Sequence, residues 1–208
     1  MNITYVTGIH GDEIAPIIAL ASIGERFLIA NPPATVKGRR FIEMDMNQAF
    51  GVENSDKLLE QRLADELLTK IPEENFVIDF HTFSAVSEPF AVVVDDKMIG
   101  LASTLGVDHV VYMKHNIKNG HALINYKDGI SIEVGSHQDI RSMQKTLQVV
   151  NCLKTGATRP VKVYEVYDKI TEPGEYTNFQ KHKEGFVPVL AGERAYDFFG
   201  LKAKLVSE

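Results

Sequence analysis

Strand-like and helix-like stretches alternate along the first three quarters of this 208-residue chain, and this order constrains the fold most. Apolar, β-branched runs predict strands, and apolar residues at helical spacing predict helices. The predicted strands are residues 2–7, 39–43, 75–80, 89–94, 108–112, 122–126 and 129–134, and the predicted helices are 13–29, 97–105 and 139–153, with another between Ser55 and Pro72. This order predicts an α/β fold: a mixed, mostly parallel sheet with helices on both faces.

Polar residues and prolines suggest where these helices begin and end. Asp12 is the expected N-cap of the first helix, and Ser55 that of the second. Asn31-Pro32-Pro33 is expected to end the first helix, because proline cannot continue it.

The pattern changes after Thr155-Gly156. From Pro160 onwards it is the alternation of β-structure, with turn residues at Glu172-Pro173-Gly174. We therefore predict two parts: an α/β domain over residues 1–155 and a small β-rich C-terminal appendage over residues 156–208.

Composition and charge exclude several classes of partner. The net charge of −6 argues against nucleic-acid binding, which needs a basic face. No apolar run approaches the roughly 20 residues that span a bilayer, and no signal-peptide-like leader opens the chain. The single cysteine, Cys152, fits a reducing compartment. We expect a cytoplasmic protein without a membrane partner; a homo-oligomer is compatible with the sequence, which does not specify an oligomeric state.

A possible metal site begins at Gly8-Ile9-His10-Gly11-Asp12-Glu13, directly after the first predicted strand. His10 and Glu13 are three residues apart at a strand-to-helix corner, so both can face one point. His81 follows the strand at 75–80, and in α/β folds ligands bind beyond the carboxyl ends of the strands. Two histidines and one glutamate are a common ligand set of catalytic zinc, so the sequence predicts one Zn²⁺ per chain.

Two further residues would complete a hydrolytic site. Glu133 is a carboxylate within the apolar strand at 129–134, and burial is costly for such a group unless it is paired or functional. It is the candidate base for a water whose pKa the metal lowers towards about 7. Arg40, in the strand predicted at 39–43 that leads to the loop Asp45-Met46-Asn47, is the candidate cation for an oxyanion.

Four motifs together resemble the succinylglutamate desuccinylase/aspartoacylase family, which has a zinc carboxypeptidase-like fold. The motifs are Gly8-Ile9-His10-Gly11-Asp12-Glu13, Asp45-Met46-Asn47, Asp79-Phe80-His81 and Glu133-Val134-Gly135. Their order agrees with the family, and they cover the chain from Met1 to about Leu153. By this resemblance, His10, Glu13 and His81 would bind Zn²⁺.

The resemblance also implies roles for other residues. Glu133 would be the general base and acid, and Arg40, chosen over Arg39 by the family register, would polarise the scissile carbonyl. Asp45 would hold a ligand histidine or Arg40 in place. Asn47 and, from the C-terminal region, Tyr196 would contact the substrate.

One position departs from the family pattern. The Asp-x-Asn motif is normally followed by an arginine that grips a substrate carboxylate, and here the residue is Gln48. A neutral amide replaces a bidentate cation, so we expect Gln48 to contact the substrate without supplying a charge. The family's acidic substrates therefore do not carry over directly.

The expected function is a zinc-dependent amidohydrolase that removes an acyl group from a small N-acyl amino acid or related amide. One alternative is a carboxypeptidase-like metallopeptidase that acts on small peptides. Another is a zinc-binding or ligand-binding protein that has lost catalysis; the presence of Glu133 disfavours it.

Overall fold

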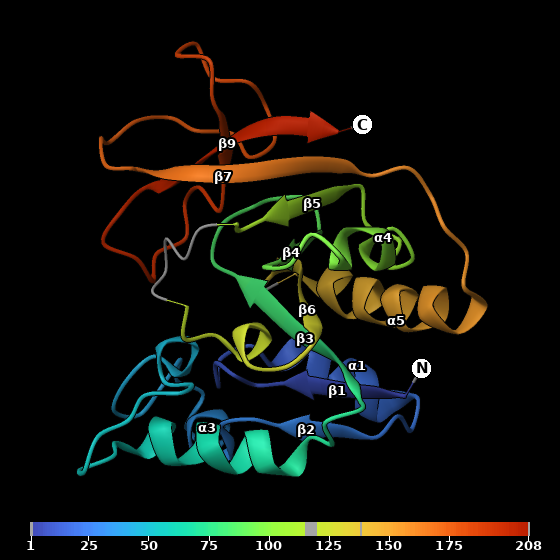
Figure 1. Cartoon of the computed structure of the whole chain (residues 1–208), viewed down its shortest axis with the longest axis vertical. Helices are drawn as coiled ribbons and strands as arrows, with labels where there is room; N and C mark the ends of the chain where they lie inside the picture. The colour runs from blue at the N-terminus through green and yellow to red at the C-terminus, as the bar shows by residue number, and fades with distance from the viewer. Residues whose placement is uncertain (1, 115–119, 138, 208) are drawn as a thin grey trace.

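The computed structural model describes residues 2–114, 120–137 and 139–207. In this part of the chain the strands form one nine-stranded sheet, in the order β2-β1-β3-β6-β4-β5-β7-β9-β8. The strands are β1 (Ile3–Thr7), β2 (Phe27–Ile29), β3 (Phe76–Phe83), β4 (Phe90–Val93), β5 (His109–Tyr112), β6 (Gly129–Ser136), β7 (Lys162–Ile170), β8 (Val187–Val189) and β9 (Gly200–Ser207). Figure 1 shows β1 and β2 at one end of the molecule and β7 and β9 at the other.

The sheet is mixed and mostly parallel, as predicted. β1 pairs in parallel with β2 and β3, β3 with β6, β4 with β5, and β5 with β7. The antiparallel pairs are β4 with β6, β7 with β9, and β8 with β9. The central β3–β6–β4 part therefore contains one reversal of strand direction.

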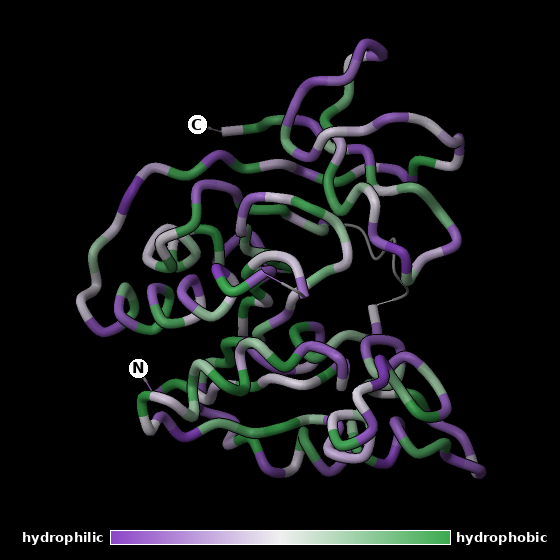
Figure 2. Tube along the Cα trace, turned by 180° about the vertical axis from the view of Figure 1, so that it is seen from behind, coloured by the Kyte–Doolittle hydropathy of each residue, from purple (hydrophilic) through white to green (hydrophobic). Residues whose placement is uncertain are grey.

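Helices cover both faces of the sheet, also as predicted. They are α1 (Ile14–Ser22), α2 (Pro32–Lys37), α3 (Leu59–Lys70), α4 (Met98–Ala102) and α5 (Ile140–Thr155), with 3₁₀ turns η1 (Met46–Gln48) and η2 (Leu123–Asn125). Residues of α1, α4 and α5 pack with one face of the sheet in one cluster, and residues of α3 pack with the other face near β1 and β3. Hydrophobic and hydrophilic residues alternate along α5 (Figure 2), as expected for a helix with one buried face. No described helix has the length and hydropathy needed to cross a membrane.

The helix predicted at 13–29 is too long. α1 ends at Ser22, because Gly24 has φ +70°, a left-handed conformation that commonly ends helices. Phe27–Ile29 instead form β2 beside β1. Asn31-Pro32-Pro33 begins a helix rather than ending one: Asn31 accepts a hydrogen bond from the Ala34 amide, and proline is well suited to the first turn.

Two predicted strands are not strands. Residues 39–43 form a loop, because backbone amides there donate to the side chain of Glu60 instead of to a neighbouring strand. Residues 122–126 contain the 3₁₀ turn η2. Ser55 is not an N-cap: α3 begins at Leu59, and the Gln61 side chain accepts from the Leu58 amide at 2.8 Å.

The C-terminal region is β-rich, as predicted, and it continues the main sheet. β7 pairs with β5 through Val163 beside Val110 and Tyr164 beside Val111. β9 and β8 then extend the sheet beyond β7. The division of the chain into two domains near residue 155 stays a prediction.

Candidate metal centre and active site

The first loop after β1 carries His10 and leads to Glu13 at the start of α1. Gly8 turns the chain with φ +66°. Gly11 lies so close to α2 that an added Cβ would be 2.1 Å from the Ala34 carbonyl carbon, so this position requires glycine. The two glycines thus let the loop fold back against α2, and the side chains of His10 and Glu13 come into contact.

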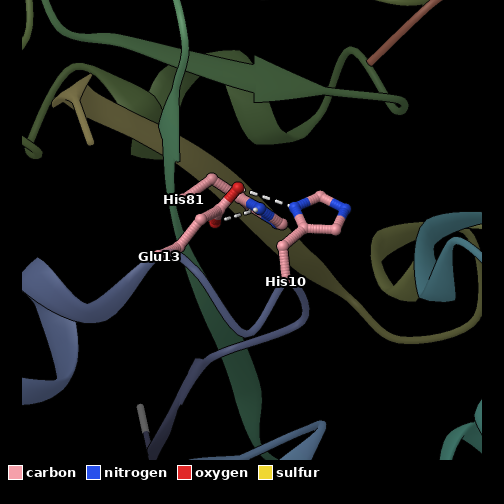
Figure 3. A group of neighbouring side chains, drawn as sticks. All are labelled: His10, Glu13 and His81. Carbon is pink, nitrogen blue, oxygen red and sulfur yellow. Dashed lines mark hydrogen bonds and ion pairs between the residues drawn. The ribbon is translucent and has the colours of Figure 1, made fainter. Parts of the chain in front are cut away.

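His81 joins this pair from β3. It was expected just after a strand, but β3 continues two residues further, to Phe83, so His81 lies within the strand. The carboxylate of Glu13 contacts both histidines (Figure 3): Nδ1 of His10 is 2.6 Å from Oε1, and Nδ1 of His81 is 3.1 Å from Oε2. All three residues are buried, and one ligand atom from each lies within 4.8 Å of the others.

A carboxylate lies behind each histidine ring. Nε2 of His10 is 3.2 Å from Oδ1 of Asp45, and Nε2 of His81 is 2.7 Å from Oδ2 of Asp79. Metal-binding histidines commonly place their second nitrogen against such a carboxylate, which fixes the ring and raises its basicity. Asp79 was not identified from the sequence as a site residue, although it lies two residues before His81 and therefore on the same strand face.

The charges in this cluster favour a cation. Burial opposes protonation of His10 and His81, but the charges of Glu13 and of Asp79 and the hydrogen bonds to carboxylates raise the pKa of both rings above 6.5. Burial likewise opposes ionisation of Glu13, but the two histidines lower the pKa of its carboxyl group strongly. If both histidines were neutral, the cluster would contain the three carboxylates of Glu13, Asp45 and Asp79. Among the described residues, only one guanidinium, that of Arg40, would balance them. A divalent cation would neutralise this excess of negative charge.

The cluster fits a metal by its donor set. The donor atoms are a ring nitrogen from His10, a ring nitrogen from His81 and a carboxylate oxygen from Glu13. The second nitrogen of each ring is held by an aspartate. Three protein ligands of these types leave a position for water or substrate, which is the pattern of catalytic rather than structural zinc sites.

Arg40 and Asp45 lie beside this cluster. Nε and Nη2 of Arg40 donate to Oδ2 of Asp45 at 3.2 and 3.1 Å, and Nη1 is 3.9 Å from Oε1 of Glu13. Burial would lower the pKa of Arg40, but the neighbouring carboxylates raise it, so the group stays charged. The backbone amide of Asn47 donates to Oδ1 of Asp45 at 2.9 Å. The structure thus places Asp45 against both partners that were expected for it.

Glu60 holds the loop that carries Arg40 and Asp45. Its fully buried carboxylate accepts from the amides of Ile42, Glu43 and Met44 at 2.7–3.1 Å and from the Asn31 side chain at 3.1 Å. Burial opposes its ionisation, but these hydrogen bonds lower its pKa. Glu60 was not predicted as a site residue, because it lies on an amphipathic helix that carries no site motif.

Glu133 lies next to His81 in the neighbouring strand β6, three residues before the strand ends. Ser131, on the same face, donates to Oδ2 of Asp79 at 3.1 Å. Glu133 lines a pocket of about 420 Å³ together with the metal-centre residues, Arg40, Asp45, Asn47 and Gln48. All the site residues predicted from the sequence line this one pocket.

The C-terminal region closes one side of the pocket. Tyr196, Phe198 and Lys169 line it, and Nζ of Lys169 lies 5.0 Å from the Phe198 ring centroid. Glu193, which was not predicted, fastens this region to the loop after β3: it accepts from the Ser84 amide at 2.9 Å and hydroxyl at 2.8 Å. Such a contact joins residues 109 positions apart and leaves no local sequence pattern.

Comparisons with known proteins agree with this architecture. The model of the succinylglutamate desuccinylase/aspartoacylase catalytic domain matches residues 2–154 of the chain. A probable aspartoacylase from Prochlorococcus marinus subsp. pastoris is 27% identical over 157 residues, which are 65% of this chain and 53% of that protein. The chain thus spans about half the length of this curated relative.

Solved structures show the same fold. A succinylglutamate desuccinylase from Vibrio cholerae aligns with a TM-score of 0.76 and 18% identity, covering 99% of this chain and 81% of that one. Murine aminoacylase 3 aligns with a TM-score of 0.73 and 16% identity, covering 99% and 95%. At such identities the likeness concerns the fold alone.

Proposed function

The chain belongs to the succinylglutamate desuccinylase/aspartoacylase family, and from this premise we propose that it is a zinc-dependent amidohydrolase that deacylates a small N-acyl amino acid or related amide. The family match over residues 2–154 contains every proposed site residue except Tyr196. One observation carries the proposal: two histidines and a glutamate converge in a pocket that also contains Glu133 and Arg40.

His10, Glu13 and His81 would hold the metal, with Asp45 and Asp79 keeping the rings in place. Zinc at this position would supply Lewis acidity, which would polarise a carbonyl and lower the pKa of water. Side chains of the protein would carry out the proton transfers and stabilise the oxyanion.

Glu133 would move the proton. It is adjacent to His81 across the β3–β6 pair and lines the pocket, so its carboxylate can take a proton from the attacking water. It would then pass that proton to the amine that leaves. Arg40 would stabilise the oxyanion that forms on the scissile carbonyl, while its two hydrogen bonds to Asp45 keep it oriented.

Substrate contacts are proposed for Asn47, Gln48 and Tyr196, which line the same pocket. The small pocket supports a small-molecule substrate, and its location beside Glu133 supports a hydrolase rather than a protein that only binds metal. A cytoplasmic location rests on composition alone and stays a prediction.

Substitution of Glu133 tests the mechanism. Glu133→Gln is expected to lower kcat for N-acyl amino acids by about 10²–10⁴-fold, because a positioned acid/base contributes this much. Zinc content measured by plasma emission spectroscopy should not change, and Glu172→Gln, at an exposed position, should retain activity. Full activity in Glu133→Gln, or activity that survives complete removal of metal, would contradict the proposal.

A comparison of substrates distinguishes the metallopeptidase alternative from the proposed amidohydrolase. The zinc-loaded protein is assayed with N-acetyl amino acids beside dipeptides that have a free amino terminus. Deacylation supports the amidohydrolase; cleavage of the dipeptides alone would favour the peptidase. No turnover of either class would favour a protein that binds zinc without catalysis.

A further inference from the structure

The pocket of the proposed deacylase is lined by a polar and an apolar group of residues. The polar group includes His10, Glu13, Arg40, His81 and Glu133. Six other lining residues, which belong to one hydrophobic cluster, form an apolar wall: Phe83, Val92, Met113, Ile124, Leu190 and Phe198. These six residues also belong to the hydrophobic cluster of β4, β5 and the C-terminal strands, so the wall is part of the core.

The sheet register places this wall beside the metal centre. Asp79 on β3 is next to Ser131 on β6, and Ser131 is next to Val92 on β4. Neighbouring strands are about 4.8 Å apart, so Val92 lies two strands from the carboxylate that holds His81. The reacting amide and the wall can therefore be spanned by one small molecule.

Among the described residues, the charges that line the pocket favour a substrate with one carboxylate over a substrate with two. Apart from histidines, the cations among the described lining residues are Arg40 and Lys169. Arg40 is already bonded twice to Asp45. Lys169, which forms no ion pair with a described residue, can receive one carboxylate. Besides Glu13 and Asp45, the described lining includes the carboxylates of Glu193 and Asp197, which would repel another.

We infer that the apolar wall is a specificity subsite, and that the substrate is a monocarboxylic N-acyl amino acid with an apolar group packed on Val92 and its neighbours. This inference rests on the proposed deacylase function and names its substrate class. The apolar group belongs either to the amino-acid side chain or to the acyl chain. Both have the same chemistry, and the pocket of about 420 Å³ has room for either.

Two substrate series test the inference and separate these sources. In one, the acetyl group is constant and the amino acid is glycine, alanine, leucine, methionine or aspartate. In the other, the amine is constant as glycine and the acyl group is acetyl, butanoyl or hexanoyl. We expect kcat/KM to rise at least about tenfold along one series, since a methylene in an apolar pocket contributes about 10-fold or more. N-acetylaspartate should be at least about tenfold poorer than N-acetylmethionine.

A variant of the wall links this preference to the subsite. Val92→Thr keeps the side-chain shape but replaces a methyl group by a hydroxyl group, and should raise KM for the best apolar substrate about five- to tenfold, several times more than it raises KM for N-acetylglycine. Val86→Thr makes the same change at a position that is 88% exposed and does not line this pocket, so it should change neither value. Equal melting temperatures of the variants would show that both are folded.

The outcomes distinguish this inference from the proposed function. Preferred hydrolysis of N-acetylaspartate, or flat kcat/KM in both series, would overturn the apolar subsite and leave the deacylase intact. Absence of any hydrolysis would refute the deacylase instead. Calorimetric titration of the zinc-loaded protein with N-acetylmethionine and N-acetylaspartate would then decide: tighter binding of the former supports the subsite, and equal or weaker binding overturns it.

Discussion

The metal centre depends on residues that do not touch the proposed metal position. Asp79 is completely buried, and its Oδ2 lies 2.7 Å from Nε2 of His81 and receives the hydroxyl of Ser131. These contacts hold the His81 ring in one orientation, in which its Nδ1 points towards Glu13. We therefore expect this buried carboxylate to contribute to the affinity of the proposed site for a metal ion.

Replacement of Asp79 tests this dependence. Asp79→Asn keeps the shape but removes the charge behind His81, and zinc affinity should fall about 10–100-fold. The measurement is competition with a chromogenic chelator, with circular dichroism to show that the fold is retained. Asp168→Asn, on the exposed side of β7, is the control and should bind zinc normally. Unchanged affinity in Asp79→Asn would contradict a positioning role.

The pH dependence of stability follows from the raised pKa values of His10 and His81. A raised pKa means that protonated rings stabilise the metal-free fold below the ordinary value of 6.5, and that this contribution is lost as pH rises through the raised values. The metal-free protein should therefore melt at lower temperature at about pH 9 than at about pH 6. Zinc replaces the protons, so the zinc-loaded protein should lose less. Parallel slopes of melting temperature against pH in the two forms would contradict this explanation.

Site residues differed in how readily the sequence revealed them. His10, Glu13, His81 and Glu133 are in short motifs that follow or lie in apolar strands, and the structure gathers all four in one pocket. Asp79 bonds to His81, two residues further along the same strand, and also to the distant Ser131, whereas Glu193 bonds to Ser84. The bonds to Ser131 and Ser84 depend on tertiary distance, and no single stretch of sequence encodes them.

At the scale of secondary structure, a loop without a strand or helix carries two of the site residues. Residues 39–45 bring Arg40 and Asp45 to the cluster, and the carboxylate of Glu60 on α3 anchors that loop through three backbone amides. An anion can replace a neighbouring strand as the acceptor for backbone donors. This explains why the strand predicted there is absent while its residues still reach the site.

Glu60→Gln is predicted to weaken both stability and catalysis. The amide keeps the volume but offers fewer acceptors and no charge, leaving buried backbone donors poorly bonded, which should cost about 1–3 kcal/mol of unfolding free energy. Because Arg40 and Asp45 are displaced together, kcat should fall more than KM rises. Chemical denaturation and steady-state kinetics measure the two effects. Glu66→Gln, 61% exposed on the same helix, should alter neither; a stable variant with normal kcat would show that the loop does not need this anchor.

Local boundaries were harder to predict than the elements themselves. The strands at β1, β3, β4, β5 and β6 and the helices α3, α4 and α5 appear close to their expected positions. β2 was read as the end of a helix, since Phe27 continues the helical spacing of α1. Gly24 and the pairing of Phe27 with Tyr5 decide otherwise, and the second of these is a tertiary contact.

At the scale of the whole molecule, the sheet runs without interruption through the predicted domain boundary. β7 continues it from β5, and Val163 packs with the helix-covered core of the α/β part. Eight of the fourteen buried residues in the cluster behind the apolar wall come from beyond residue 155. The C-terminal region therefore completes a core that the first 155 residues share.

A chain truncated to residues 1–155 should consequently fail to fold on its own. It would leave β5 as an exposed sheet edge and uncover apolar residues of β4 and β5, including Val92 and Val111. Thermal unfolding followed by circular dichroism should lack the cooperative transition of the full chain, and the fragment should bind a hydrophobic dye. The full chain, purified in parallel, is the control. A fragment with a cooperative transition that also binds zinc would show instead that residues 1–155 are an independent domain, to which the C-terminal strands add only the wall of the pocket.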